Sequence, residues 1–528
     1  MQASRRALHF SMREFFSKLS QHSAATADRS AIVAPGCSYS YRNLLSRVRA
    51  GADWARCLPV RVGLLFGKTA DSILADLALS FAGKELVPLP AFFSDSQLAH
   101  IIRTAGLAHA VSDPISAARA RSLGLITTGL GATALSNSEP ASEARRIIFT
   151  SGSTGRPKGV RLSSKQAVAS AIAVAHATSA SSEDCYLSIL PSALLLEQIA
   201  GIYVPFLVGA SVHLPAPAPA SVPEASSVAS IANAIRPTAT VLVPDLLAAW
   251  VNELEMQDQV APSTLRYVAV GGAPVSKRLE SDAWQRGLPV YQGYGLSECG
   301  SVVCVNRPGT RASGTAGQPL SGVHVTIDAG EIVVAGPTVM DGYLNEAETS
   351  GAWRTGDLGG FDPEGRLIVK GRKDNTIVTN AGRNVNPEWL EEMVGSDRRI
   401  KRCIVVEQNG ELISVITPAD VSIDAGAPAL RDILAHAVRE APDYAKPRQY
   451  LVLSDKEFID LELLSPNGRP RRSAIRSVVA GRIAFQPHSS VKGMQCRTFN
   501  SCLREPAARA SSSSRSLSSK RRYVGAHR

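Results

Sequence analysis

The chain has 528 residues, of which 45% are hydrophobic and 20% are charged, and its formal net charge is +11. At about 150 residues per domain, this length predicts roughly three to four structural units of ordinary globular composition. A stapled mini-protein, a fibre and a wholly disordered chain are therefore not expected, whereas the positive charge points toward a nucleic-acid or membrane partner.

Most of the positive charge lies at the end of the chain. Residues 483–528 hold nine basic residues and one acid, which is +8 of the +11, so the first 482 residues carry only +3. This end is rich in Ser and Arg and lacks apolar periodicity, which predicts a basic disordered tail. A solvated appendage, a polyanion-binding tail and a sequence end unrelated to the fold all remain open. Because the remainder is nearly neutral, we expect no nucleic-acid partner.

The cysteines and the start of the chain predict a cytoplasmic protein. None of the eight cysteines forms a CxxC pair, and no His pair has zinc-finger spacing, so reduced thiols are expected. Arg5 and Arg6 are not followed by the apolar core of a secretory signal, and no run of about 18 apolar residues could span a membrane.

Apolar runs and helical stretches alternate along the first 270 residues. The expected strands are 62–66, 86–89, 109–112, 146–149, 186–190, 241–243 and 267–270, and the expected helices include 70–81 and 96–105. This alternation predicts a parallel sheet that is covered on both faces. The Pro/Ala-rich stretch 216–223 is expected to form a surface loop.

The pattern then changes twice. Short strands at 323–327, 331–334 and 366–369, separated by Gly turns, predict a mainly antiparallel module. Beyond it we expect helices at 386–394 and 429–440 and strands at 403–407, 412–416 and 450–453. The predicted fold class is α/β, with a large domain (1–373) of parallel αβ layers plus a small β-rich module. A small mobile α+β domain (374–482) and the tail (483–528) follow.

A Gly-rich segment after the strand at 146–149 is the strongest chemical signal. It contains Thr150, Ser151, Gly152, Ser153, Thr154, Gly155 and Lys158. Glycines let backbone N–H groups approach an anion, hydroxyls add donors and Lys158 adds a charge, so the segment predicts a polyphosphate cradle. It is not a P-loop, because Pro157 stands where a Gly is required. A flexible surface loop is the alternative.

Two further segments are weak signals alone and become informative together with the Gly-rich segment. Residues 291–298 contain Gly293, Tyr294, Gly295, Ser297 and Glu298. There Tyr294 could stack on a base, Ser297 could donate to a phosphate and Glu298 could bind Mg²⁺. Farther on, Asp357 and Arg372 could bind the hydroxyls of a ribose, although each alone could equally be a turn or surface residue.

The order of these segments resembles the adenylate-forming superfamily, which includes acyl-CoA synthetases, adenylation domains and luciferases, from about residue 10 to residue 482. Gly271, Gly272 and Ala273 resemble its adenine-side loop, and Asp357 matches its ribose Asp. The resemblance makes Asp374 the hinge between the two domains. It places Gly382 and Asn384 in the loop of the second half-reaction, and residues 466–468 in the last motif.

The resemblance implies an ATP-dependent carboxylate–thiol ligase. A carboxylate attacks the α-phosphorus of ATP to give acyl-AMP and pyrophosphate, and a thiol then attacks the acyl carbon. Lys158, Glu298 and Arg469 would be the catalytic residues, with Mg²⁺ on Glu298. The expected ligands are ATP, Mg²⁺, a small carboxylic acid and coenzyme A, or the phosphopantetheine of an acyl carrier protein.

Arg469 departs from the family, which usually places Lys directly after the Asn-Gly of the last motif. Arg keeps the charge but is bulkier and planar. Three interpretations remain open. Arg469 can replace the Lys functionally, adenylation can be impaired, or a neighbour such as Arg471 or Arg472 can serve instead.

The acyl region departs as well. Residues 190–201 contain no His after Leu190-Pro191, and they lack the Asp with which amino-acid-activating domains hold an amino group. Leu194 to Leu196 indicate either an apolar acyl group or simple core packing, and Glu197 is either a polar determinant or a solvated residue. Further pocket candidates are Tyr203, Gly271 to Ala273, Gly293 and residues 299–301.

The favoured function is an acyl-CoA ligase for a fatty or aryl acid. Its rivals are a fatty-acid–AMP or acyl-carrier-protein ligase, and a catalytically impaired nucleotide-binding homologue.

Overall fold

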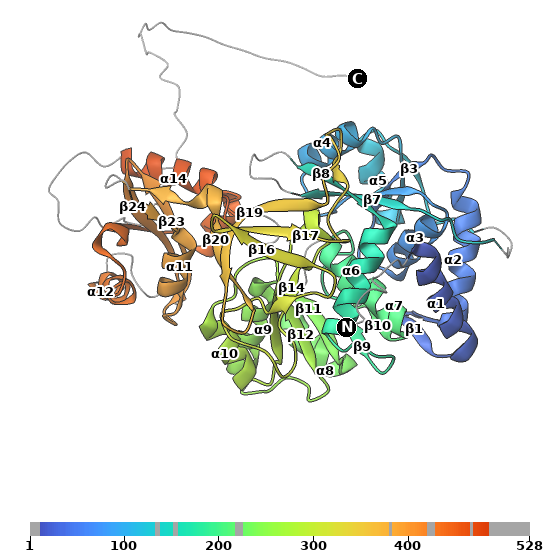
Figure 1. Cartoon of the computed structure of the whole chain (residues 1–528), viewed down its shortest axis with the longest axis horizontal. Coiled ribbons are helices and arrows are strands. Elements are labelled where there is room, and N and C mark those ends of the chain that lie inside the picture. Colours follow the sequence, from blue (N-terminus) through green and yellow to red (C-terminus); the bar gives the residue numbers. More distant parts are fainter. Residues whose placement is uncertain are drawn as a thin grey trace, which may run out of the picture.

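The computed structural model describes residues 11–132, 138–150, 157–216, 225–379, 383–419, 428–464 and 468–484. Within them the strands form two large mixed sheets, one antiparallel sheet and two small C-terminal sheets. In Figure 1 the C-terminal elements, in orange, lie at one end of the molecule beside the yellow antiparallel sheet, and the two large sheets lie beyond it.

The first large sheet has nine strands among the described residues, in the order β15-β14-β13-β12-β11-β9-β10-β1-β2. They are β1 (Ser30–Ala34), β2 (Cys37–Ser40), β9 (Cys185–Leu187), β10 (Ser211–His213), β11 (Ala239–Leu242), β12 (Tyr267–Val270), β13 (Val290–Tyr294), β14 (Cys304–Val305) and β15 (Gln318–Pro319). From β13 to β1 all neighbours are parallel, whereas β2, β14 and β15 join the edges antiparallel.

The second large sheet has seven strands in the described part of the chain, in the order β18-β8-β7-β4-β3-β5-β6. They are β3 (Arg61–Leu65), β4 (Glu85–Pro88), β5 (His109–Ser112), β6 (Ile126–Thr128), β7 (Arg145–Thr150), β8 (Lys158–Ser163) and β18 (Gly342–Tyr343). Parallel pairing holds from β6 to β7, and β8 and β18 are antiparallel additions. The predicted parallel layers are thus confirmed, and the antiparallel edges are an addition.

The expected β-rich module is the four-stranded antiparallel sheet β16-β17-β19-β20. Its strands are β16 (His324–Asp328), β17 (Glu331–Ala335), β19 (Ala352–Phe361) and β20 (Leu367–Arg372). Three of these strands lie where the sequence predicts them. The long β19 was not predicted, because its Gly-rich sequence (Gly356, Gly359 and Gly360) does not show the pattern of a strand.

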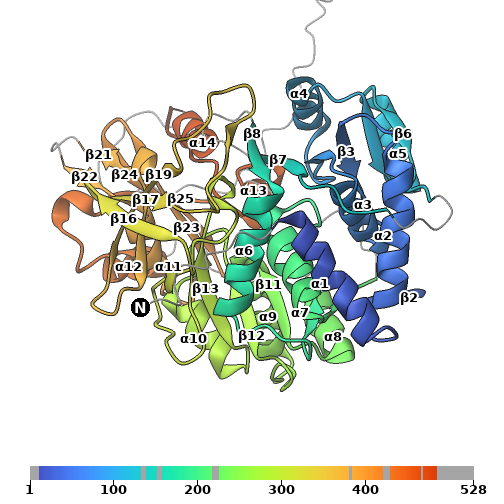
Figure 2. The same ribbon diagram turned by 45° about the vertical axis from the view of Figure 1, so that its right-hand side comes forward.

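Helices cover both large sheets. They are α1 (Met12–Ala25), α2 (Tyr41–Ala55), α3 (Ala70–Phe81), α4 (Asp95–Ala105), α5 (Pro114–Ser122), α6 (Ser164–Ala177), the π-helix η2 (Glu197–Tyr203), α7 (Val204–Val208), α8 (Ala225–Ile235), α9 (Pro244–Met256), α10 (Lys277–Gln285) and the short 3₁₀ turn η3 (Ser297–Cys299). Figure 2 shows α1 lying between α2 and α6, which it contacts on either side.

Local chemistry fixes the two helices that the sequence predicts best. In α4, Ser94 and Gln97 form a capping box, and Gly106 ends the helix in the left-handed conformation at φ 61°. In α3, Thr69 accepts a hydrogen bond from the backbone N–H of Ser72. Almost every side chain of α3 is buried, since this helix contacts β1 of the nine-stranded sheet as well as β3 and β4 of the seven-stranded sheet.

The residues after β20 build a separate α+β unit. It contains η4 (Lys373–Asn375), β21 (Ile377–Val378), β22 (Asn384–Val385), α11 (Pro387–Gly395), β23 (Ile400–Gln408), β24 (Glu411–Pro418), α12 (Pro428–Ala437), η5 (Asp443–Ala445), β25 (Gln449–Val452), α13 (Asp455–Asp460) and α14 (Arg472–Ala484). Its two hydrophobic clusters lie on either side of the sheet β23-β24-β25 and share no residue with the core of the large sheets. We refer to the elements from β21 to α14, which follow the single turn η4, as the C-terminal unit.

The structure shortens one predicted strand and describes little of two other predicted segments. The strand predicted at 186–190 ends at Leu187, and the chain bends at Leu190, directly before Pro191. Most of the Pro/Ala-rich stretch and nearly all of the basic tail lie outside the described residues. Across the ranges that the structure describes, no helix is long and apolar enough to cross a membrane.

Candidate active site

The chemical segments meet at one edge of the nine-stranded sheet. Parallel strands end at a common edge, and ligands bind there in open α/β sheets. Gly271 follows β12 at this edge, Tyr294 ends β13, and the backbone N–H of Gly271 donates to the carbonyl oxygen of Leu242 at the end of β11, 3.2 Å away. The antiparallel sheet and the C-terminal unit contribute further residues to the same place.

Tyr294, Asp357 and Arg372 form a closed polar group. The Tyr294 hydroxyl donates to Oδ2 of Asp357 at 2.6 Å, and Nε of Arg372 lies 2.8 Å from Oδ1. Asp357 and Arg372 are direct cross-strand partners in β19 and β20. Burial, and then the neighbouring Asp357 carboxylate, raises the pKa of Tyr294 far above its ordinary value. Asp357 is therefore a carboxylate held at the site in a fixed orientation.

Glu298 lies beside this group in a second chain of contacts. The hydroxyl of Tyr343 donates to Oε1 of Glu298 at 2.8 Å. On its other side the Tyr343 ring is contacted by Nζ of Lys158, 4.7 Å from the ring centroid, in a cation–π arrangement. Lys158 also lies 3.4 Å from Oε1 of Glu346, an exposed ion pair of small energetic weight. Tyr343 thus connects two residues that the sequence predicts to act together.

Glu298 is compatible with Mg²⁺ but does not form a metal site alone. Within the described ranges, no group of three or more His, Cys, Asp or Glu side chains could hold a metal ion. Mg²⁺ is commonly bound by one or two carboxylates together with substrate phosphates, so the half-buried Glu298 carboxylate fits this requirement.

The predicted phosphate cradle is described only at its two ends. Thr150 ends β7, Lys158 begins β8, and the two residues pair across the antiparallel ladder. Residues Ser151, Gly152, Ser153, Thr154 and Gly155 lie outside the described residues.

Close packing requires one of the glycines in the segment 291–298. A Cβ on Gly295 would lie 1.8 Å from the carbonyl oxygen of Ser301, so no other residue fits. Gly293 belongs to β13 and pairs with Val305, and Ser297 begins η3 next to Glu298. Gly272 has φ 90°, and with Gly271 and Ala273 it forms a half-buried turn after β12.

Arg469 reaches this site from the C-terminal unit. Its Nε donates to the carbonyl oxygen of Gly272 at 2.6 Å. Partial desolvation by the surrounding protein, and then the positive charge of Arg372, lowers the pKa of Arg469, while Asp357 and Glu298 act in the opposite direction; one side of the residue stays exposed. The arginine that departs from the family pattern therefore lies among the predicted nucleotide-binding residues.

The neighbouring arginines are engaged elsewhere. Arg472 forms an ion pair with Glu388 and another with Glu391 inside the C-terminal unit, and its side chain is 11% exposed. Arg471 lies 3.1 Å from the carboxylate of Glu462.

The C-terminal unit is closely docked around Arg469. A Cβ on Gly468 would lie 2.6 Å from Oδ2 of Asp245 in α9, and Gly468 has φ 77°. Arg398 also forms an ion pair with Asp282 of α10 at 2.8 Å. The predicted hinge residue, Asp374, lies in the exposed single turn η4 between β20 and β21.

The predicted thiolation loop is only partly described. Asn384 is an exposed residue at the start of β22, and Gly382 lies outside the described residues.

The acyl region contains a buried acidic side chain, that of Glu197. Glu197 is 0% exposed, so the interpretation of Glu197 as a solvated residue is wrong. Tyr203, a pocket candidate, is also fully buried, and its hydroxyl accepts a hydrogen bond from Arg146. Leu195 is buried in the core, whereas Leu194 and Leu196 are only partly buried. Tyr343, through its contacts with Glu298 and Lys158, is a site residue that only the structure shows.

Comparisons with known proteins agree with this geometry. Residues 19–344 match the family model of the AMP-binding enzymes. A 2-succinylbenzoate–CoA ligase of Bacillus cereus is 29% identical over 339 residues, which cover 59% of this chain and 67% of the relative. The corresponding ligase of Bacillus cytotoxicus is 30% identical over the same shares.

Solved structures share the fold. An anthranilate CoA ligase in complex with anthranoyl-AMP aligns with a TM-score of 0.79 and 19% identity, covering 91% of this chain and all of the other. O-succinylbenzoate coenzyme A synthetase of Bacillus subtilis, in complex with AMP, has a TM-score of 0.73 and 23% identity over 86% of this chain and 97% of its own. The chain therefore belongs to the AMP-binding enzyme family of AMP-dependent synthetases and ligases, and its predicted enzyme class, an ATP-dependent acid–thiol ligase, is confirmed.

Proposed function

We propose that the protein activates a small aryl carboxylic acid with ATP and transfers the resulting acyl group to the thiol of coenzyme A. The observation that carries most weight is the position of Arg469, whose guanidinium contacts Gly272 and whose charge interacts with Asp357 and Glu298. The aryl acid and the CoA acceptor are supported by relatives named for 2-succinylbenzoate and by a structural neighbour named for anthranilate.

The first half-reaction brings two anions together. A carboxylate oxygen bonds to the α-phosphorus of ATP, and pyrophosphate leaves. The positive charges of Lys158 and Arg469 would reduce the repulsion between the reactants, since both belong to the group of contacts around Tyr343 and Asp357. Asp357, fixed by Tyr294 and Arg372, would accept hydrogen bonds from the ribose hydroxyls.

Glu298 would hold Mg²⁺ through its carboxylate, with Tyr343 fixing the orientation of that carboxylate. The metal ion, when bound, would neutralise phosphate charge. Tyr343 retains its own proton for this hydrogen bond, because burial and then the Glu298 carboxylate raise the pKa of Tyr343 well above its ordinary value.

The second half-reaction needs access to the acyl carbon, which the thiol attacks as AMP leaves. We propose that the C-terminal unit moves about Asp374, so that residues 1–373 and 374–482 act as two domains and Asn384 approaches the site. Supporting this proposal, η4 is a single exposed turn, and the C-terminal unit has hydrophobic clusters of its own.

The test is pyrophosphate release from ATP over a panel of aryl and fatty acids, with and without CoA. We expect release only with an acid, the highest rate with a small aryl acid, and acceleration by CoA. Release without any acid would contradict the ligase. Acid-dependent release that CoA never accelerates would favour an acyl-AMP or carrier-protein ligase, and ATP binding without turnover would favour the impaired homologue.

A further inference from the structure

A buried ion pair closes the segment that leaves β9 beside the active site. Nζ of Lys68 donates to the carbonyl oxygen of Leu190 and lies 3.3 Å from Oε1 of Glu197. Leu190 begins the segment 190–196, and Glu197 directly follows it. One lysine thus binds both ends, so the segment is held as a closed loop.

The carboxylate of Glu197 has two further partners, one in β9 and one directly after it. The Tyr186 hydroxyl donates to Oε2 at 3.0 Å, and the Ser188 hydroxyl donates to Oε1. Together with Lys68, these contacts occupy most of the acceptor capacity of a carboxylate. Glu197 is therefore a residue that positions its surroundings, because little capacity is left for a ligand.

The middle of the segment is also anchored. The hydroxyl oxygens of Ser72 and Ser192 lie 3.1 Å apart, and Nε2 of Gln198 donates to the Ser192 carbonyl oxygen at 3.0 Å. Gln198 is in turn held by Arg146, itself paired with Asp76 of α3. Residues 191–194 are only partly buried, in contrast to the fully buried Glu197. Fixed anchors therefore support a partly exposed segment.

The position of the anchored segment in the fold indicates its role. β9 lies parallel to β11, which is followed in the sheet by β12 and β13, so Ser188 leaves the same edge that carries Gly271 and Tyr294. Lys68 comes from the turn between β3 and α3, so the ion pair also connects the seven-stranded sheet to this edge. The first turn of the helix after the segment is a π-helix, a form often found at functional sites.

We infer that the Lys68–Glu197 ion pair positions the segment 190–196 as one wall of the acid-binding site, and that this wall determines which acids are accepted. The inference rests on the proposed function. A contribution to stability alone does not explain the presence of the Lys68–Glu197 ion pair. Removing two charges from water costs several kcal/mol, and proteins with apolar replacements of such pairs are often no less stable. The pair does provide a fixed geometry between two sheets.

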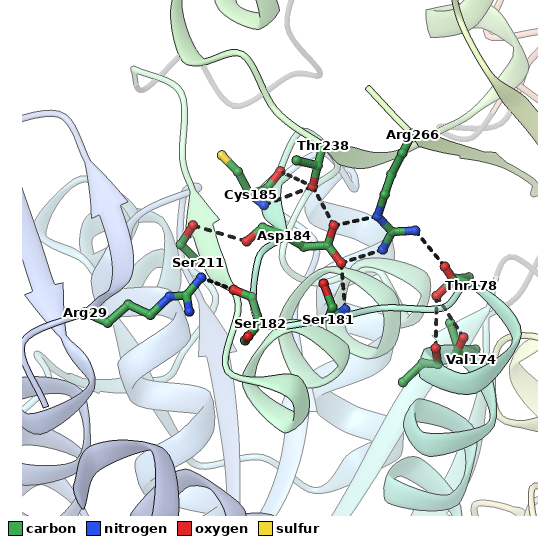
Figure 3. A network of polar contacts seen from close by, with 11 residues as sticks. Arg29, Val174, Thr178, Ser181, Ser182, Asp184, Cys185, Ser211, Thr238 and Arg266 are labelled. Carbon is green, nitrogen blue, oxygen red and sulfur yellow. Dashed lines mark hydrogen bonds and ion pairs between the residues drawn. The ribbon is translucent and has the colours of Figure 1, made fainter. Parts of the chain in front are cut away.

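The test compares Glu197→Gln with Asp184→Asn, a matched control at a buried carboxylate directly before β9, at the end of β9 opposite to Ser188. Asp184 is buried, pairs with Arg266 and accepts from Thr238, as Figure 3 shows. Acid and ATP are varied separately in the pyrophosphate assay. We expect Glu197→Gln to raise the KM of the best acid about tenfold or more and to change the order of acids, with the KM of ATP within about twofold. Asp184→Asn should lower stability and keep the order.

Lys68→Met should reproduce the changed order, and the Lys68→Met/Glu197→Gln double variant should lose no more selectivity than the worse single variant. An unchanged acid order in Glu197→Gln, at a loss of stability equal to that of Asp184→Asn, would overturn the inference. If Glu197→Gln fails to fold, Ser72→Ala removes a single contact with the segment and must still shift the acid KM.

Hydrogen exchange of residues 190–196 distinguishes the two proposals. Faster exchange in Glu197→Gln but not in Asp184→Asn supports the anchoring role of the pair, and equal exchange contradicts it. A wild-type protein that activates no acid would contradict the proposed function itself, and with it the assignment of the segment to an acid site.

Discussion

Nε of Arg469 donates a hydrogen bond of 2.6 Å to the main-chain carbonyl oxygen of Gly272. The two residues are almost 200 positions apart, and they join the C-terminal unit to the turn after β12, which is the predicted adenine-side loop. The acceptor is a backbone atom, so the contact does not depend on the side chain at position 272. An arginine can therefore reach the site where the family usually has a lysine.

We predict that Arg469→Ala lowers the rate of acyl-AMP formation about a hundredfold or more, because a charge beside the reacting anions is lost. Thioester formation from synthetic acyl-AMP should change by less than about threefold. Arg471→Ala is the matched control, since its partner is Glu462 in the C-terminal unit. Loss of adenylation in Arg471→Ala instead would mean that the wrong arginine has been assigned.

Arg469→Lys asks whether the natural arginine limits the first step. If Arg469 replaces the lysine functionally, the rate of pyrophosphate release should stay within about threefold of the wild type. A rise of about tenfold would mean that roughly 1.4 kcal/mol of transition-state stabilisation had been missing. That result would favour the impaired homologue.

Gly468→Ala should impair acyl-AMP formation selectively. The added Cβ would lie 2.6 Å from Oδ2 of Asp245 and would be strained at φ 77°, so the C-terminal unit could not dock as described. We expect a loss of about tenfold or more in pyrophosphate release, with thioester formation largely retained. Gly481→Ala in α14 is the control, because its Cβ meets nothing within 4 Å. Equal losses in both half-reactions would point to misfolding.

Asp357→Asn should raise the KM for ATP about tenfold or more, because a charged acceptor and its ion pair with Arg372 are lost. The KM for the acid should change little. Asp362→Asn tests the same type of change at the far end of the hairpin between β19 and β20, where Asp362 pairs with Arg366. The assignment of Asp357 to the nucleotide is wrong if Asp362→Asn raises the KM for ATP equally.

Asp184→Asn should destabilise the protein in a pH-dependent way. Burial alone would raise the pKa of Asp184, but hydrogen bonds from Arg266, Ser181 and Thr238 outweigh it, so this pKa lies below the ordinary value. A carboxyl with a lowered folded-state pKa stabilises the protein above the unfolded pKa of about 3.9, and this stabilisation is lost as the pH falls through the folded value.

Urea unfolding at several pH values measures this effect. The wild type should exceed Asp184→Asn by about 2 kcal/mol in free energy of unfolding at pH 7, and the difference should shrink below about pH 4. A difference that is constant with pH would contradict the role of the charge.

Sequence periodicity predicts those elements whose stability is local. The residues predicted for α3 match its observed bounds, because its cap, Thr69, and its apolar residues are adjacent in the sequence. The antiparallel edges of the large sheets could not be predicted, since β18 is two residues long and depends on β8, which lies far away in sequence.

The same distinction between local and long-range determinants applies to the candidate active site. Asp357, Arg372, Tyr294 and Glu298 belong to motifs whose order suggests a shared site, and the fold brings them together. The contacts of Tyr343 and the burial of Glu197 depend on packing between distant segments, which no local pattern reports. The same holds for Lys68, an isolated lysine in the sequence that pairs across two sheets.

The burial of α3 between the two large sheets has a consequence for how the protein loses its structure. Strands of both sheets contribute to one continuous hydrophobic cluster, with Ile148 and Val160 from one and Val241 and Val268 from the other. Neither sheet can separate without exposing the faces of α3, so both should unfold in a single cooperative transition. The C-terminal unit, with its own clusters, is free to melt independently and should be the first part to yield to heat or to a protease.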